Sequence, residues 1–234
     1  MNLKINGIFI DFDDTLYDYE SCHQYASQKV FSILSQKTGF KEEELLRRYQ
    51  EAKRSIHVPL HGTASSHNRL LYFQKMIEQF PNQIEFPVTL ARICYKQYWD
   101  TFIDRIVLFE DVISWLQLLK NQNRKIVMVT DLTADVQFKK IERLRLENLI
   151  DLVVTSEESG CEKPHPYIFE LALRKSDLSP SQVCMIGDSY DKDILGAINM
   201  NIHAFWLNRS GKSRPITDKI TEIKEFKEMR GYLK

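Results

Sequence analysis

The first apolar stretch of the chain is short and ends abruptly at acidic residues. Residues 4–10 are rich in β-branched and aromatic side chains, and Asp11-Phe12-Asp13-Asp14 follows directly. A continuous apolar run of this length, bounded by polar residues, is typical of a strand that is buried on both faces. The pattern therefore predicts a buried strand whose carboxyl end carries polar chemistry.

The pattern then becomes helical and stays so over residues 17–105. Breaks at Gly39, at 59–62 and at 81–87 separate four predicted helices, and no segment in between has the alternation of a strand. Apolar residues recur at helical spacing, as at Leu70, Phe73, Ile77 and Phe80. These segments are expected to pack as one small helical bundle, with most of its aromatic side chains in the core.

Beyond residue 105 predicted helices and strands alternate. The helices are expected near 111–121, 134–146, 167–174 and 194–199, and the strands at 126–129, 152–154, 183–186 and 204–207. Such alternation predicts an α/β fold, a Rossmann-like parallel sheet flanked by helices, and the first strand needs the same sheet to pair its backbone. We therefore expect an α/β core of residues 1–16 and 106–234, interrupted by a helical domain of residues 17–105. The tail from residue 217 is expected to be a charged helix.

Polar side chains follow three of the predicted strands. Asp11 and Asp13 follow the first, Thr130 and Asp131 a second, and Asp188 a third. Ligands of open α/β sheets bind at the carboxyl ends of the strands, so these groups should converge. Two carboxylates two residues apart on extended backbone would crowd one pocket. Either one is protonated or a divalent cation shares them, and Mg²⁺ prefers such oxygen ligands.

Composition narrows the range of partners. Basic and acidic residues number 32 each, so no net positive field favours a nucleic-acid polymer or a membrane surface. The four cysteines lack the short paired spacing of a zinc or redox motif and are expected to be reduced, mostly buried thiols. The apolar run before Asp11 is too short for a signal peptide or a membrane span. A small-molecule partner, a cytoplasmic location and a monomer or homodimer are expected.

Four short motifs, in order, give the sequence a family resemblance. Asp11-Phe12-Asp13-Asp14-Thr15, Thr130, Lys163-Pro164, and Gly187-Asp188 with Asp193 resemble the four motifs of the haloacid-dehalogenase superfamily. The helical segment after the first motif lies where members with an inserted helical cap of the C1 type carry it. The stretch 188–206 looks most like nucleotidases and sugar-phosphate phosphatases of that superfamily.

The resemblance implies a role for each matching residue. Asp11 would be the nucleophile that forms an aspartyl-phosphate, and Asp13 the acid that protonates the leaving oxygen and then activates water. Thr130 and the backbone amide of Asp131 would hold the phosphoryl oxygens, and Lys163 would balance charge. Asp11, the backbone carbonyl of Asp13, and Asp188 would bind Mg²⁺. Asp193 would order Lys163 or a metal-bound water from outside the ligand set.

Other interpretations of the same residues remain open. Asp13 can cap a turn, Lys163 can be a solvated loop cation, and Asp188 and Asp193 can be first-turn helix acids. The cluster of His57, His61 and His67 suggests a metal site, but Pro59 breaks the helical register and a loop of the helical domain is favoured. That loop is also a hypothetical contact for the substrate.

Several functions are compatible with the motifs. A magnesium-dependent phosphatase acting on a small phosphomonoester is favoured, with a nucleoside monophosphate ranked ahead of a sugar phosphate. A dehalogenase is disfavoured because those enzymes lack the second aspartate of the first motif. A sugar-phosphate phosphomutase shares all four motifs, and a non-catalytic phosphate-binding module can retain the fold, so both remain alternatives.

Overall fold

The computed structural model describes residues 5–80 and 84–232, which divide into two compact units. Met1–Asp18 and Val107–Lys234 form an α/β unit, and Tyr19–Ile106 form a helical unit. The chain leaves the α/β unit after one strand and returns to it later. The helical unit is therefore an insertion in the sequence of the α/β unit.

The α/β unit is built on one six-stranded sheet in the order β3-β2-β1-β4-β5-β6, with every adjacent pair parallel. The strands are β1 (Gly7–Ile10), β2 (Lys125–Thr130), β3 (Leu152–Thr155), β4 (Val183–Gly187), β5 (His203–Leu207) and β6 (Ile220–Ile223). All residues of β1 and β4 are buried, as the apolar runs of a covered parallel sheet require.

The order of the strands creates a switch point beside β1. From β1 the chain continues to β2 and β3 on one side, and later crosses to β4, β5 and β6 on the other side. Loops that leave β1 and β4 at their carboxyl ends therefore diverge, which opens a crevice in parallel sheets of this kind. Asp11 and Asp188 are the first residues after these two strands.

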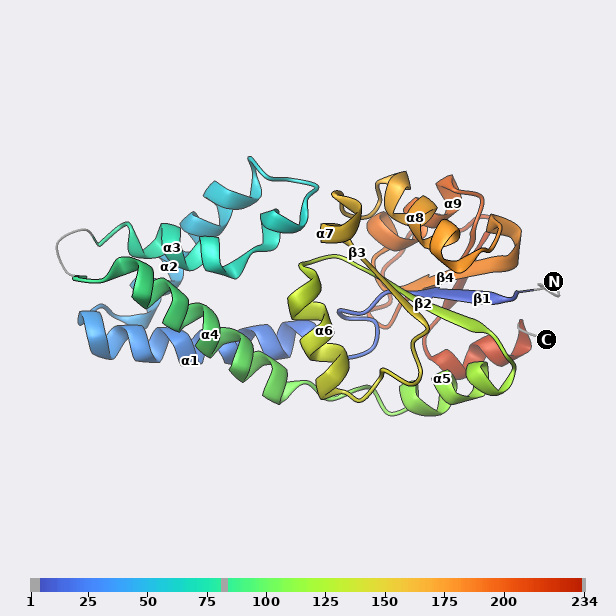
Figure 1. The fold of residues 1–234 in the computed structure, drawn as a ribbon, viewed down its shortest axis with the longest axis horizontal. Coiled ribbons are helices and arrows are strands. Elements are labelled where there is room, and N and C mark those ends of the chain that lie inside the picture. The colour runs from blue at the N-terminus through green and yellow to red at the C-terminus, as the bar shows by residue number, and fades with distance from the viewer. Residues whose placement is uncertain (1–4, 81–83, 233–234) are drawn as a thin grey trace. The chain divides into compact units, whose positions relative to one another are not determined.

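Helices cover both faces of the sheet (Figure 1). They are α5 (Val112–Asn121), α6 (Ala134–Arg143), α7 (Ser156–Ser159), α8 (Pro166–Ser176), η2 (Pro180–Gln182), η3 (Tyr190–Ile194), α9 (Leu195–Asn199) and η4 (Phe226–Gly231). On one face, Phe169 of α8 and Ala197 of α9 belong to the same buried apolar cluster as Val127 and Val129 of β2. On the other face, the ring of Trp115 in α5 stacks on that of Phe226 in η4 (Figure 1).

These elements confirm the predicted parallel sheet flanked by helices. The prediction of a charged helix from residue 217 was wrong. Residues from 217 onward form β6, which pairs with β5, and then the short helix η4. Ile220, Ile223, Phe226 and Met229 are buried at a spacing of three residues, which imitates a helical stripe. Without β6, one edge of β5 would leave its backbone groups unpaired, and the local sequence pattern does not reveal this pairing partner.

The helical unit contains four α-helices among its described residues. They are α1 (Tyr19–Thr38), α2 (Glu42–His57), α3 (Arg69–Ile77) and α4 (Pro87–Arg105), with the 3₁₀ turn η1 (Ala64–His67) between α2 and α3. Aromatic rings fill its centre, including Tyr49, Tyr72, Phe73, Tyr98 and Phe102, all of which are buried. The predicted aromatic core of this bundle is thereby confirmed.

Two further expectations concern the thiols and the membrane. Cys22, Cys94 and Cys184 are buried and Cys161 is partly exposed, and all four are free thiols.

Among the described residues, none of the helices combines the length and apolar character needed to cross a lipid bilayer.

Candidate active site

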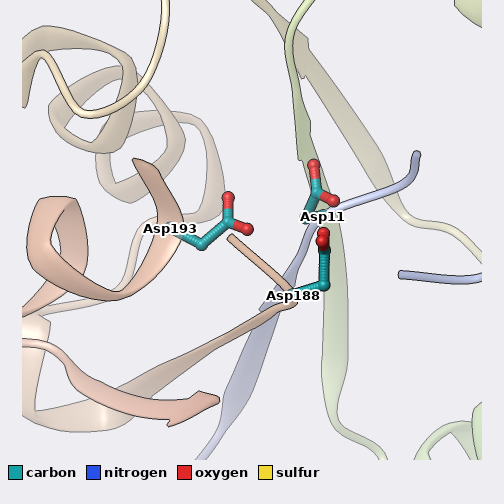
Figure 2. Close-up of side chains that lie close together, drawn as sticks. All are labelled: Asp11, Asp188 and Asp193. Carbon is teal, nitrogen blue, oxygen red and sulfur yellow. The ribbon is translucent and has the colours of Figure 1, made fainter. Parts of the chain in front are cut away.

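Three carboxylates converge where β1 and β4 end (Figure 2). Asp11, Asp188 and Asp193 each present an oxygen, and these oxygens lie within 4.8 Å of one another. Asp11 and Asp188 come from the loops after the two strands, and Asp193 comes from the helix η3. Figure 2 shows the three side chains directed toward a common point.

Burial and mutual repulsion perturb all three carboxyl groups. Burial, together with the charges of Asp11 and Asp14, raises the pKa of Asp188 to about 7. Burial is also the main cause of the raised pKa of Asp11 and of Asp193, although Lys163 opposes it in both cases. Carboxylates crowded in this way are stabilised by a cation, and oxygen-rich sites suit Mg²⁺. These three residues are therefore the metal-ligating candidates of the described chain.

Lys163 is the cation that the fold itself supplies to this cluster. Its side chain is buried, and Nζ lies 2.5 Å from Oδ1 of Asp11 and 2.7 Å from Oδ1 of Asp193, and donates to the carbonyl of Val129 at 3.0 Å. Although burial opposes it, the neighbouring carboxylates raise the pKa of Lys163 well above its usual value. One ammonium group among three carboxylates leaves negative charge for a further cation to balance.

Further hydrogen bonds hold one oxygen of each of the three carboxyl groups. The hydroxyl of Thr15 donates to Oδ2 of Asp11 at 2.7 Å and also lies 3.2 Å from Oδ1 of Asp188. The backbone amide of Ser189 donates to Oδ2 of Asp193 at 3.0 Å. Both oxygens of Asp193 are thus engaged, one by Lys163 and one by the backbone.

Asp13 lies in a different environment from Asp11. Its Oδ1 accepts hydrogen bonds from the hydroxyl of Tyr17 and from Nζ of Lys140, the latter at 2.8 Å. Its Oδ2 lies 3.1 Å from Nζ of Lys140 and 3.4 Å from Nε2 of Gln137. The carboxylate of Asp13 is not part of the group of oxygens that lie within 4.8 Å of one another in the described residues, but its charge, after burial, contributes to the raised pKa of Asp11.

The carboxyl end of β2 brings Thr130, its last residue, and Asp131, the next residue, to the same edge of the sheet. Nε2 of Gln137 lies 2.5 Å from Oγ1 of Thr130 and 2.7 Å from the carbonyl oxygen of Asp131. The carboxylate of Asp131 accepts the backbone amide of Lys163 at 3.1 Å and pairs with Nζ of Lys192 at 2.8 Å. Although burial opposes it, Asp131 and Glu162 raise the pKa of Lys192.

Sequence reasoning did not identify three of these polar residues. Gln137 and Lys140 lie on α6, away from the ends of strands where the motifs lie, and Lys192 lies on η3 between Asp188 and Asp193 of the fourth motif. A weak signal was present for two of them, since Gln137 and Lys140 occupy the stripe of α6 that also contains Val136 and Ile141. Polar residues in the buried stripe of an amphipathic helix need partners, and here those partners are Asp13 and Thr130.

The histidines of the helical unit are neighbours. The ring centroids of His57 and His67 lie 5.0 Å apart, and those of His57 and His61 lie 5.9 Å apart. The three do not form a convergent set of metal-ligating atoms in the described part of the chain. Asp191 lies in the first turn of η3 and pairs with Arg214.

Comparisons with known proteins give the family. The family model described as haloacid dehalogenase-like hydrolase matches residues 5–201. The ribulose-1,5-bisphosphate 5-phosphatase of Halopiger xanaduensis is 34% identical over 209 residues, which cover 88% of this chain and 86% of that protein. The N-acylneuraminate-9-phosphatase of Homo sapiens is 28% identical over 222 residues, which cover 91% and 88%.

A solved structure agrees in fold. The HAD phosphatase from Thermococcus onnurineus superposes with a TM-score of 0.76 at 22% identity, covering 97% of each chain. Because the family model matches most of the chain, the resemblance inferred from the sequence is confirmed. The protein belongs to the haloacid dehalogenase-like hydrolase family.

Proposed function

We propose that this protein is a magnesium-dependent phosphatase that hydrolyses a small phosphomonoester through an aspartyl-phosphate on Asp11. The observation that carries the proposal is the buried cluster of Asp11, Asp188 and Asp193 around Lys163, at the carboxyl ends of the central strands. The phosphatase names of the two curated relatives point to the same reaction class.

Asp11 is the proposed nucleophile. Lys163 and Thr15 each hold one of its two oxygens, so the carboxylate is oriented before substrate arrives. Attack by Asp11 forms a bond to phosphorus and breaks the bond to the ester oxygen. Asp13 donates the proton that the leaving oxygen needs, and then accepts a proton from the water that cleaves the aspartyl-phosphate.

The residues present suit a magnesium ion. The raised pKa values of the carboxyl groups and the excess of negative charge are what an added divalent cation would relieve. Asp11, Asp188 and the backbone carbonyl of Asp13 are the proposed ligands, and Asp193 is proposed to orient Lys163, to whose Nζ its Oδ1 lies at 2.7 Å. Bound Mg²⁺ would neutralise charge on the phosphoryl oxygens.

Thr130, the backbone amide of Asp131 and Lys163 are the proposed phosphate-binding groups. They lie at the same edge of the sheet as Asp11, and Gln137 fixes the orientation of Thr130. A carboxylate at Asp131 would repel phosphate, but Lys192 and the amide of Lys163 offset its charge. The helical unit is proposed to serve as the cap that selects the substrate.

The relatives shift the expected substrate toward sugar phosphates. The ribulose-1,5-bisphosphate 5-phosphatase and the N-acylneuraminate-9-phosphatase both act, by their names, on phosphorylated sugars. We therefore propose a sugar or sugar-acid phosphate ahead of a nucleoside monophosphate. This reverses the order that the sequence alone suggested.

Phosphate release tests the proposal. The purified protein is assayed on sugar phosphates, sugar-acid phosphates, nucleoside monophosphates and small organic phosphates, with Mg²⁺ or with chelator. Magnesium-dependent release concentrated on sugar phosphates is expected, and Asp11→Asn, which removes the nucleophile at nearly constant shape, should be silent while folded by circular dichroism. Silence of the wild type across the panel would favour the phosphomutase or the non-catalytic module.

A further inference from the structure

Lys140 is a buried lysine that none of the four motifs includes. It lies on α6, and its side chain is fully buried. Nζ lies 2.8 Å from Oδ1 and 3.1 Å from Oδ2 of Asp13, so the ammonium group contacts both oxygens of that carboxyl group. It also lies 5.8 Å from the ring centroids of Phe12 and Tyr17.

A buried ammonium group is costly unless it is well paired. Removing such a charge from water costs several kcal/mol, which a carboxylate in contact and nearby aromatic faces can offset. A salt bridge of this kind contributes little net stability compared with apolar packing of the same volume. Its clearest physical effect is to fix the position of the carboxyl group that it contacts.

Gln137 extends this contact to Thr130 and Asp131, at the carboxyl end of β2. It precedes Lys140 by three residues, about one helical turn, and therefore lies on the same side of α6. Its Nε2 lies near three acceptors, namely Oγ1 of Thr130, the carbonyl oxygen of Asp131 and Oδ2 of Asp13. One turn of α6 thus links Asp13 to Thr130.

We propose that Lys140 and Gln137 are positioning residues that hold the carboxyl group of Asp13 against the oxygen of the leaving group. Lys140 fixes both oxygens of Asp13, and Gln137 ties their position to the loop that binds the phosphoryl group. The proposal rests on the proposed function, because it assigns these residues to proton transfer in the first half of the phosphatase reaction. In that step the bond from phosphorus to the ester oxygen breaks, and the proton moves from Asp13 to that oxygen.

A positioning role for the proton donor predicts dependence on the leaving group. A leaving group that departs as a stable anion gains little from protonation, whereas a poor one depends on it. General acid catalysis typically contributes on the order of 10²- to 10⁴-fold. Disturbing Asp13 should therefore slow poor leaving groups far more than good ones, whereas a general loss of structure would slow all of them alike.

The test compares phenyl, 4-nitrophenyl and 2,4-dinitrophenyl phosphate, which differ little in shape. Lys140→Met is expected to lower kcat/KM for phenyl phosphate at least about tenfold more than for 2,4-dinitrophenyl phosphate. Lys140→Arg should restore part of the difference because it returns a donor to Asp13. Lys175→Met is the control, since Lys175 pairs with Glu158 on α7 and should show no such selectivity.

A second variant and the activity of the wild type separate loss of the fold from loss of positioning. If Lys140→Met does not fold, Gln137→Met is measured in the same way and carries the same prediction. An equal loss for all three esters, or no loss, in a folded variant would overturn the positioning proposal while wild-type activity upholds the proposed function. Wild-type silence on all three esters and on the substrate panel would overturn both together.

Discussion

Replacing Asp188 by Asn should stabilise the metal-free protein while removing its response to magnesium. In the free protein, burial and the charges of Asp11 and Asp14 raise the pKa of Asp188 from 3.8 to about 7. A raised pKa means that the folded state holds a proton that the unfolded state has released. The contribution of Asp188 to stability is therefore fully present below 3.8 and is lost as the pH rises through about 7.

The size of this effect follows from the two pKa values. The difference between 3.8 and about 7 corresponds to at most about 4 kcal/mol of unfolding free energy above neutral pH. Asn carries no charge and retains an oxygen at the position that lies 3.2 Å from the hydroxyl of Thr15. At about pH 8 with chelator, Asp188→Asn should be more stable than wild type by about 1–4 kcal/mol, and the gain should shrink toward about pH 4.

Urea unfolding with chelator and with saturating Mg²⁺ measures both effects. Magnesium should raise the unfolding free energy of wild type by mass action and leave that of Asp188→Asn nearly unchanged. Asp191→Asn is the matched control, because the side chain of Asp191 is 64% exposed and pairs with Arg214 away from the cluster. A metal-free Asp188→Asn protein less stable than wild type at about pH 8, with an undiminished response to Mg²⁺, would refute the reasoning.

Three further predictions follow from the same geometry. Lys192→Ala should raise KM several-fold by leaving the charge of Asp131 without its ammonium partner, and adding Asp131→Asn should restore it; steady-state kinetics showing no recovery would count against this pairing. Gly187→Ala should lower kcat by about tenfold or more, because the added Cβ would lie 2.2 Å from Oδ2 of Asp193, and full activity would contradict the role given to Asp193. Chelation should abolish phosphate release, with Mg²⁺ restoring it and Ca²⁺ restoring it poorly because of its looser coordination geometry; metal-independent release would oppose the proposed site.

The sheet was predictable because its strands are local features of the sequence. The strands β1 and β4 are continuous apolar runs, each followed directly by an acidic residue of a motif. The hydrophobic pattern and the motif therefore place the end of each strand at the same position. In contrast, β6 depends on the free edge of β5, a partner that local spacing does not reveal. Its buried residues at intervals of three favoured a helix in the absence of that partner.

In the candidate site, residues at the ends of strands could be predicted from the sequence, whereas residues on the helix α6 could not. Asp11 and Asp188 follow strands and Thr130 ends one, so these residues could be located from the sequence, since parallel strands bring their carboxyl ends to one edge. Gln137 and Lys140 could not, because their partners depend on which side of α6 faces the sheet edge.

The central claim is that Asp11 receives the phosphoryl group. The most direct measurement uses Asp13→Asn, which keeps the nucleophile but lacks the group proposed to activate water, together with 2,4-dinitrophenyl phosphate, whose leaving group needs little protonation. After rapid acid quenching, mass spectrometry of the digested protein should find one phosphoryl group on the peptide that contains Asp11, with magnesium and not with chelator. A phosphoryl group on another peptide, or steady phosphate release by this variant with no phosphorylated protein, would contradict the account.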